Sequence, residues 1–418
     1  MSFVEKFFHE RHVSQNPLTS IAEQRIKAQG PMPFEAYMDL ALNGGVAKDG
    51  TYFPGYYSGD KISIGYSDNN PSEKKGDFTT SPECSPIFGF CIAKQILEMW
   101  EIMGKPLDFT IAEMGAGNGT LTYDVIHGLR YLDPKAAEAI NYLIIEQSPS
   151  LIARQREKLK DLPVRFLHES AADIKMELTG VFFSNELIDA LPTQVVRRNK
   201  KDWSQLYIGK GSSDSFSEVW GEPQDEVMEH VQKYTWKVKS GDYIPVNLNA
   251  KRWMKNVAVS LKRGYVTTVD YDTSGYKPLR AYGNSRDKQI AGYMDKKRLG
   301  EFDVTSDVHF QALADTGREN GLLVVGDNTQ GGFLQGTEYH KMRDEIPLIP
   351  GYKEVIGGRK YCSFRTHKLI TDFSGMRVMI QAKGVDVSEP LSGSVHIYHD
   401  LETKEKKDFV PLRTAESL

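Results

Sequence analysis

Residues 108–130 read DFTIAEMGAGNGTLTYDVIHGLR, and this stretch decides the fold. A short apolar run ends at the acid Glu113, three alternate glycines follow, and residues 121–130 have the character of a helix. Glycines let the backbone turn tightly, and the N-terminus of a helix supplies free N–H groups. A strand, a glycine turn and a helix in this order predict one βα unit of an α/β protein, with a ligand site at the turn.

The same alternation continues along the chain. Buried-type strands are predicted at residues 142–146, 164–167, 181–183, 265–269, 322–325 and 377–382, with a helix at 149–160. Strands that alternate with helices indicate a mostly parallel sheet covered on both faces, which is a Rossmann-like α/β domain. Ahead of this domain, residues 33–42 and 86–103 have the apolar spacing of helices.

The glycine turn lacks the last small residue of a dinucleotide fingerprint. That pattern, G-x-G-x-x-G/A, requires Gly or Ala at its sixth position, where this chain has Thr120, so an NAD-linked oxidoreductase is disfavoured. The spacing is instead G-x-G-x-G after an acid, which is typical of S-adenosylmethionine sites and suits a cofactor with an ammonium and a sulfonium. We therefore predict S-adenosylmethionine as the cofactor. The predicted contacts in this segment are Glu113, Gly115, Ala116, Gly117 and Gly119.

Two further acids complete the predicted cofactor site. Glu146 ends the next strand, where one carboxylate accepts both hydroxyls of a ribose. Asp173 follows the third strand, where it would bind the adenine amino group. The alternative for Glu146 is a solvated acid at the end of a strand, and the alternative for Asp173 is an ordinary acid in a loop. We see no cluster of metal ligands in the sequence and expect none, so the cofactor would supply the chemistry.

The loop at residues 185–192, NELIDALP, follows the fourth strand at the carboxyl edge of the sheet, where ligands of open α/β sheets bind. Asn185, Glu186 and Asp189 are therefore predicted at the reactive end of the cofactor, with Asn185 as a cofactor contact. The alternative is a helix cap and first turn, for which these residue types are also suited.

Composition argues against several classes of partner. The net charge of −4 gives no overall positive field, so we predict no nucleic-acid partner. No apolar run is long enough to cross a bilayer, so we predict no membrane span. The three cysteines, Cys84, Cys91 and Cys362, form no CxxC pair and fit a reducing compartment.

The first 18 residues lack the apolar core of a signal peptide, and the acids Glu5 and Glu10 are unfavourable in a mitochondrial presequence. We expect a cytoplasmic protein, or a protein of the mitochondrial matrix if a targeting segment is missing from this sequence. The 418 residues exceed the usual size of one core, so several regions are expected. They are a helical and loop-rich region at 1–105 that closes over the site, a core at 106–196 and 251–384, an insertion at 197–250, and a C-terminal extension at 385–418.

Three segments together resemble the MidA family. They are residues 30–38, which begin GPMPF, the stretch GDFTTSPE at 76–83, and NELIDALP at 185–192. Further matches lie at 55–57, 88–89, 146–151, 155, 269–271, 303–310 and 377–384, so the resemblance extends over most of the chain.

The resemblance implies a class I methyltransferase with a seven-stranded sheet, a helical N-terminal region and an inserted substrate-side subdomain. Because the family is related to the mitochondrial complex I assembly arginine methyltransferase, it also implies methylation of a protein arginine, with S-adenosylhomocysteine as product. A homodimer is compatible with these observations. One departure is Asp272, which stands where a glycine commonly follows Asp-Tyr.

An arginine acceptor requires carboxylates, because a guanidinium with a pKa of about 13.8 must be aligned and must lose a proton. We predict Glu186 as the orienting carboxylate, supported by Asp77 and Asp189. Asp77 is equally suited to fixing its loop over the cofactor, and Thr80 and Ser81 of that loop are predicted cofactor contacts.

The predicted acceptor side consists of Tyr56, Tyr57, Glu83 and His309. Aromatic rings suit a cation, although plain packing would account for the two tyrosines equally well. His309 would be a base for a hydroxyl or carboxyl acceptor, or a hydrogen-bonded structural histidine. Two other functions stay open, namely an O- or N-methyltransferase of a small molecule and a non-catalytic assembly factor on the same fold.

Overall fold

The computed structural model describes residues 16–59, 64, 78–234, 238–272, 279–282, 293–348, 363–371, 373, 375–394, 398–399 and 406–407. Contacts divide the chain into two compact units. The first comprises Met1–Lys61, Pro192–Val246 and Pro278–Thr305, and the second comprises Ile62–Leu191, Asn247–Lys277 and Ser306–Leu418. We call them the five-stranded unit and the seven-stranded unit, after the largest sheet in each.

The sheet of the seven-stranded unit has the order β15-β16-β12-β7-β4-β5-β6. Its strands are β4 (Thr110–Met114), β5 (Asn141–Ile145), β6 (Val164–Leu167), β7 (Leu178–Asn185), β12 (Leu261–Tyr271), β15 (Leu323–Thr329) and β16 (Met376–Lys383). Neighbours from β6 to β12 are parallel, whereas β16 is antiparallel to both β12 and β15. The predicted mostly parallel seven-stranded sheet is therefore confirmed.

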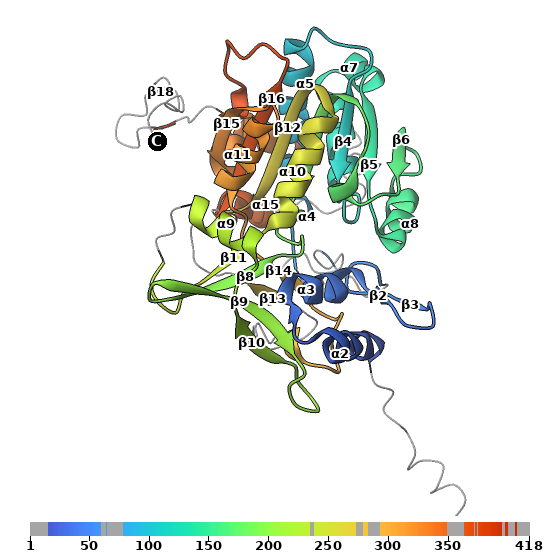
Figure 1. Cartoon of the computed structure of the whole chain (residues 1–418). Helices are drawn as coiled ribbons and strands as arrows, with labels where there is room; N and C mark the ends of the chain where they lie inside the picture. The colour runs from blue at the N-terminus through green and yellow to red at the C-terminus, as the bar shows by residue number, and fades with distance from the viewer. Residues whose placement is uncertain are drawn as a thin grey trace, which may run out of the picture. The chain divides into compact units, whose positions relative to one another are not determined.

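Successive side chains of a strand point to opposite faces of a sheet, and the burial follows this rule. Ile111 and Phe183 belong to one buried cluster, and Ala112 and Phe182 belong to another. Helices α5 (Ile87–Ile102) and α6 (Thr120–Leu132) cover the first face. The second face is covered by α10 (Leu248–Ser260) and α11 (Phe310–Glu319), which are labelled in Figure 1. This unit is thus a helix–sheet–helix sandwich.

Shorter elements complete the unit. They are α4 (Ser81–Cys84), α7 (Pro134–Ala139), α8 (Pro149–Lys158), η1 (Ala171–Asp173), α12 (Gln330–Gly336), α13 (Tyr339–Glu345), η4 (Ile346–Leu348), α15 (Ser363–Thr371), η5 (Ser392–Ser394) and the ribbon of β17 (Tyr398–His399) with β18 (Lys406–Lys407). Ser392 and Gly393 bind Glu98 and Gln95 of α5, so this part of the predicted C-terminal extension packs on the core.

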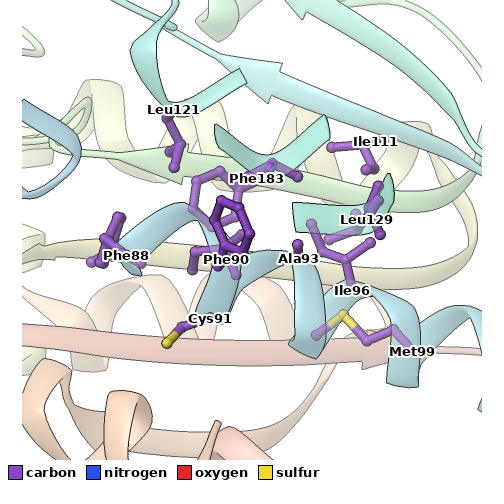
Figure 2. Close-up of a cluster of buried hydrophobic side chains, with 14 of the residues drawn as sticks. Phe88, Phe90, Cys91, Ala93, Ile96, Met99, Ile111, Leu121, Leu129 and Phe183 are labelled. Carbon is purple, nitrogen blue, oxygen red and sulfur yellow. The ribbon is translucent and has the colours of Figure 1, made fainter. Parts of the chain in front are cut away.

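Close approach of α5 and α6 builds the core between them and the sheet. Figure 2 shows Phe88, Phe90 and Ile96 of α5 with Leu121 and Leu129 of α6. Two glycines permit this packing. A Cβ at Gly89 would lie 2.3 Å from the Cβ of Asp124, and a Cβ at Gly128 would lie 2.8 Å from that of Ala93.

The five-stranded unit is built on an antiparallel sheet of order β1-β9-β8-β11, with β10 paired to β9. The strands are β1 (Met32–Pro33), β8 (Gln194–Asn199), β9 (Asp202–Gly209), β10 (Ser217–Gly221) and β11 (Tyr243–Val246). The unit also contains three helices, α2 (Pro17–Gln29), α3 (Phe34–Asn43) and α9 (Asp225–Lys233). Two short antiparallel ribbons complete it, namely β2 (Gly45–Val46) with β3 (Tyr52–Phe53) and β13 (Arg280–Tyr282) with β14 (Asp303–Thr305). No helix in the described part of the chain is long and apolar enough to cross a bilayer.

The observed units differ from the predicted regions at two places. Residues 62–105, predicted with the N-terminal region, belong to the seven-stranded unit, because α5 packs on its sheet. Residues 278–305, predicted in the core, belong to the five-stranded unit. Tyr37 of α3 donates to the carbonyl of Tyr293 at 2.5 Å, and Lys296 pairs with Glu23 of α2 at 2.8 Å, so this segment is tied to the N-terminal helices.

The substitution Gly89→Ala is expected to destabilise the seven-stranded unit by about 1–3 kcal/mol, because the added methyl group overlaps Asp124. Gly331→Ala in α12 is the matched control, since the nearest atom to its added Cβ is Ile370 Cγ2 at 3.8 Å. The better helix propensity of alanine should stabilise that variant by up to about 1 kcal/mol. Urea unfolding measures the free energy of unfolding of the two variants. If this free energy changed with the same sign in both, the assignment of Gly89 to a tight helix contact would be contradicted.

Candidate active site

The candidate site lies at the carboxyl edge of the seven-stranded sheet. Strand order reverses between β4 and β7, since β5 and β6 follow on one side and β12 lies on the other. In open α/β sheets, ligands bind outside the carboxyl ends of the strands at such a switch point. The glycine turn follows β4 and the loop at 185–192 follows β7, so the topology brings these two predicted segments together.

The glycine turn has the backbone that its residues require. Gly115, Gly117 and Gly119 all have positive φ, at 71°, 52° and 72°, which disfavours any residue with a side chain. The turn is tied to the next strand by a hydrogen bond from Gly115 N–H to the carbonyl of Ile145 at 3.0 Å. Gly119 occupies the N-cap position of α6, and Ala116 is buried.

Glu113 is held inside the fold. Its side chain is 3% exposed, and Oε2 accepts hydrogen bonds from the hydroxyls of Thr122 at 2.6 Å and Tyr142 at 2.5 Å. Burial raises the pKa of Glu113 to about 7, although both hydroxyl bonds oppose the shift. The carboxyl group therefore connects β4 to α6 and β5, and its predicted contact with the cofactor stays a prediction.

Glu146 and Gln155 form the side of the site next to β5. Glu146 is 6% exposed, and its oxygens accept from Ser148 N–H at 3.0 Å and from Gln155 Nε2 at 3.2 Å. Gln155 Nε2 also donates to the carbonyl of Gly117 at 2.9 Å. Because the Glu146 carboxylate and the Gly117 carbonyl can only accept hydrogen bonds, the NH₂ group of Gln155 must point toward them and its oxygen must point away. Gln155 Oε1 is then buried and has no hydrogen-bond partner among the described residues, which leaves an acceptor for a ligand hydroxyl.

Thr120 uses its hydroxyl where a dinucleotide fingerprint has a small residue. It donates to Glu83 Oε1 of α4 at 2.7 Å and accepts from Lys158 Nζ of α8 at 2.6 Å. Glu83 therefore fastens α4 to the start of α6. This contact accounts for the position of Glu83, and the predicted role of Glu83 in binding the methyl acceptor stays a prediction.

Glu186 is fixed in the loop after β7. It is partly buried, and its backbone has φ of 50°, an uncommon conformation for a residue other than glycine. Oε1 accepts from Ser81 N–H at 3.1 Å and from Asn185 Nδ2 at 3.2 Å, and the Tyr271 hydroxyl lies 3.5 Å from Oε2. Burial and the neighbouring Asp189 raise the pKa of Glu186 to about 8.

Two more carboxyl groups lie beside Glu186. Asp189 is 6% exposed and Asp270 of β12 is fully buried. Burial and the charge of Asp189 raise the pKa of Asp270 well above its usual range, and Glu186 adds to the shift. Glu186, Asp189 and Asp270 thus form an acidic cluster, which we call the carboxylate cluster.

The loop before α4 is described from Phe78 onward, so Asp77 lies outside the described residues. Thr80 occupies the N-cap position of α4 and its carbonyl accepts from Glu83 N–H at 3.1 Å. Ser81 is fully buried, and its hydroxyl donates to Gln330 Oε1 at 2.9 Å. Ser81 therefore acts on Glu186 through its backbone, while direct contact of Thr80 or Ser81 with the cofactor stays a prediction.

The other predicted residues are placed differently. Asp173 is exposed in η1, and its predicted contact with the adenine stays a prediction. His309 Nδ1 caps α11 by accepting from Ala312 N–H at 3.1 Å, and burial lowers its pKa to about 4, so it is neutral at physiological pH. Tyr56 and Tyr57 belong to the five-stranded unit, where Tyr57 donates to Asp303 at 2.6 Å.

Sequence analysis did not identify Asp270 or Gln155 as site residues. Both lay within segments that carried the family resemblance, so that resemblance was the available indication. Within the described ranges, no group of three or more His, Cys, Asp or Glu side chains is arranged to hold a metal ion.

Comparison with known proteins identifies the family of this chain. Residues 91–327 match the sequence family described as "Putative S-adenosyl-L-methionine-dependent methyltransferase". The chain is similar to the protein arginine methyltransferase NDUFAF7 homolog, mitochondrial, of Drosophila melanogaster, with 27% identity over 373 residues that cover 81% of this chain and 79% of the relative. The human protein arginine methyltransferase NDUFAF7, mitochondrial, is 23% identical over 337 residues, or 72% and 69% of the two chains.

A solved structure shows the same fold. It is a protein of Burkholderia thailandensis crystallised with bound S-adenosyl-homocysteine, with a TM-score of 0.72 and 22% identity over 90% of this chain and 94% of that chain. The predicted resemblance to methyltransferases related to the mitochondrial arginine enzyme is confirmed by these relatives.

The substitution Gln155→Leu is expected to weaken S-adenosylmethionine binding about tenfold, because it leaves Gly117 O and Glu146 Oε2 without their common donor. Isothermal titration calorimetry measures the affinity. Glu157→Gln, at an exposed position of the same helix, is the control and should bind as the unmodified chain does. Unchanged affinity in Gln155→Leu would show that this amide does not organise the cofactor site.

Proposed function

The chain belongs to this family of S-adenosylmethionine-dependent methyltransferases, and on that premise we propose that it methylates the side chain of arginine in a protein substrate. The observation that carries the proposal is the fixed carboxylate of Glu186, held by Ser81 N–H and Asn185 beside Asp189 and Asp270. An acidic cluster favours a cationic acceptor, because an arriving positive charge stabilises the ionised form of carboxyl groups whose pKa values burial and mutual repulsion have raised.

The residues of the seven-stranded unit fit the cofactor. The glycine turn leaves room for close approach of a ligand, Glu146 offers a carboxylate for the ribose, and Gln155 Oε1, which no described residue bonds, offers a further acceptor. When bound, S-adenosylmethionine supplies an electrophilic methyl group on a sulfonium. The Burkholderia protein of the same fold binds the corresponding product, which supports this assignment.

Glu186 has two tasks in the proposed reaction. Its carboxylate aligns the guanidinium by charge-assisted hydrogen bonds and holds one nitrogen in line with the methyl group. The bound cofactor would supply the methyl group and keep the electron pair of the broken S–CH₃ bond, and the guanidinium nitrogen would lose one proton. Glu186 accepts that proton, which its raised pKa favours. Asp189 supports the charge of the aligned guanidinium, and Asp77 stays a predicted second support.

The names of the relatives support arginine as the methyl acceptor and also concern the cellular location of this chain. The Drosophila and human proteins are named protein arginine methyltransferases and are mitochondrial. The predicted cytoplasmic location of this chain is therefore not confirmed, and we propose the mitochondrial matrix as the location to test first. A homodimer stays a prediction.

The proposal is tested by incubating the enzyme with methyl-labelled S-adenosylmethionine and host lysate, and separating proteins from small molecules. Acid hydrolysis of the protein fraction should release labelled methylarginine. Label confined to small molecules would contradict the proposal in favour of a small-molecule methyltransferase. Binding of the cofactor with no label transferred would contradict it in favour of a non-catalytic factor.

The substitution Glu186→Gln should lower methylarginine formation by at least about 100-fold, since the amide neither carries a charge nor accepts the proton. Cofactor affinity should change little, because Glu186 faces the acceptor. Glu177→Gln, at an exposed position just before β7, is the matched control. Full turnover in Glu186→Gln would overturn the assignment of this carboxylate.

The pH dependence follows from the raised pKa of Glu186. In the free enzyme this group is protonated below a pKa of about 8 and becomes the required carboxylate above it. We expect kcat/KM for arginine methylation to rise with pH between about 7 and 9, because this ratio reports ionisations of the free enzyme. In Glu186→Gln the remaining activity should lose that rise, and an unchanged profile would assign the ionisation to another group.

A further inference from the structure

The loop that carries Glu186 is held in a conformation that its own sequence does not favour. Glu186 has φ of 50°, and a non-glycine residue stays in this region only where its surroundings impose it. Part of what imposes this backbone conformation is the contact of the loop with strand β12. Glu186 N–H donates to the carbonyl of Val269 at 2.9 Å, so the loop begins directly against the end of that strand.

Asp270 makes the next contacts along the same loop. Its Oδ2 accepts from the N–H groups of Ile188 at 2.9 Å and Asp189 at 3.4 Å, and its Oδ1 accepts from Tyr271 N–H at 2.9 Å. Both oxygens of one buried carboxyl group are thus used on backbone donors. An asparagine offers one acceptor oxygen and would turn its NH₂ group toward a donor.

The carbonyl side of the loop is held separately. Asn247 Nδ2 donates to the carbonyls of Ile188 and Leu191, both at 3.2 Å, and Ser306 N–H donates to the carbonyl of Asp189 at 2.8 Å. Asp270 is therefore the side chain that fixes the N–H side. A third buried acid next to two others is electrostatically unfavourable, so its place in the cluster requires a compensating contact, and the backbone bonds provide it.

We propose that Asp270 is a positioning residue, whose carboxyl group fastens Ile188 and Asp189 to the end of β12 and so holds the preceding Glu186 where its carboxylate meets the methyl acceptor. This inference rests on the proposed role of Glu186 in methyl transfer. Asp270 acts through the loop backbone and touches neither cofactor nor acceptor in the proposal.

The test is Asp270→Asn, with Asp272→Asn as the matched control. Asp272 follows two residues later, is partly exposed and pairs with Arg377 at 3.3 Å. Three quantities are measured, namely hydrogen exchange of peptides covering residues 186–191, the dissociation constant of S-adenosylmethionine, and kcat and KM for methylarginine formation in lysate protein.

In Asp270→Asn we expect the amides of residues 188 and 189 to exchange at least tenfold faster and kcat to fall at least tenfold. The dissociation constant of the cofactor and KM should change less than threefold, because the glycine turn is not altered. Asp272→Asn should change none of these quantities. A merely structural role would instead lower cofactor binding and kcat together.

Unchanged exchange at residues 186–191, or faster exchange with full kcat, would overturn the proposal. If Asp270→Asn does not fold, Asn247→Ser releases the same loop from the carbonyl side and should give the same split between kcat and cofactor binding. If the unmodified enzyme forms no methylarginine, the proposed function fails by itself. The exchange measurement then still decides whether Asp270 holds the loop.

Discussion

The parallel pairing of β4 with β7 is the constraint on which the site depends. Met114 and Ser184 are register partners, so the segments that leave these two strands begin at the same edge of the sheet. One is a glycine turn with three left-handed residues, and the other is a loop that starts with the left-handed Glu186. Because the strand order reverses here, the helices that follow, α6 and α10, lie on opposite faces of the sheet, which is the arrangement that leaves a crevice for a ligand.

Buried acids are the second theme of the structure. Glu113 joins α6 to β5 through two hydroxyl groups, Glu146 is bonded by Ser148 and Gln155, and Asp270 binds three backbone N–H groups. Burying a carboxyl group is costly unless its oxygens are hydrogen-bonded. Each acid meets this condition with donors from a neighbouring element, so the acids that shape the site also hold its elements together.

The sequence allowed the core elements and the cofactor side to be predicted. The βα unit at 108–130, the helix at 86–103 and the strands at 265–269 and 377–382 were visible because their apolar periodicity is local. The assignment of residues 278–305 to the five-stranded unit was not visible, since it depends on long-range bonds such as Tyr37 to Tyr293. The role of Asp270 was hidden for the same reason. It depends on backbone donors some 80 residues away, which no local pattern reports.

The short helix α4 is attached at both ends. Ser81 N–H binds the carboxylate at the end of β7, and Glu83 binds Thr120 at the start of α6, next to the glycine turn. A ligand that moves or orders α4 at one end therefore changes the free energy of binding at the other. Such coupling is reciprocal: if the bound cofactor increases affinity for the acceptor, the bound acceptor increases affinity for the cofactor by the same factor. If the acceptor meets Glu186 and the cofactor meets the glycine turn, as proposed, the four residues of α4 link the two binding events thermodynamically.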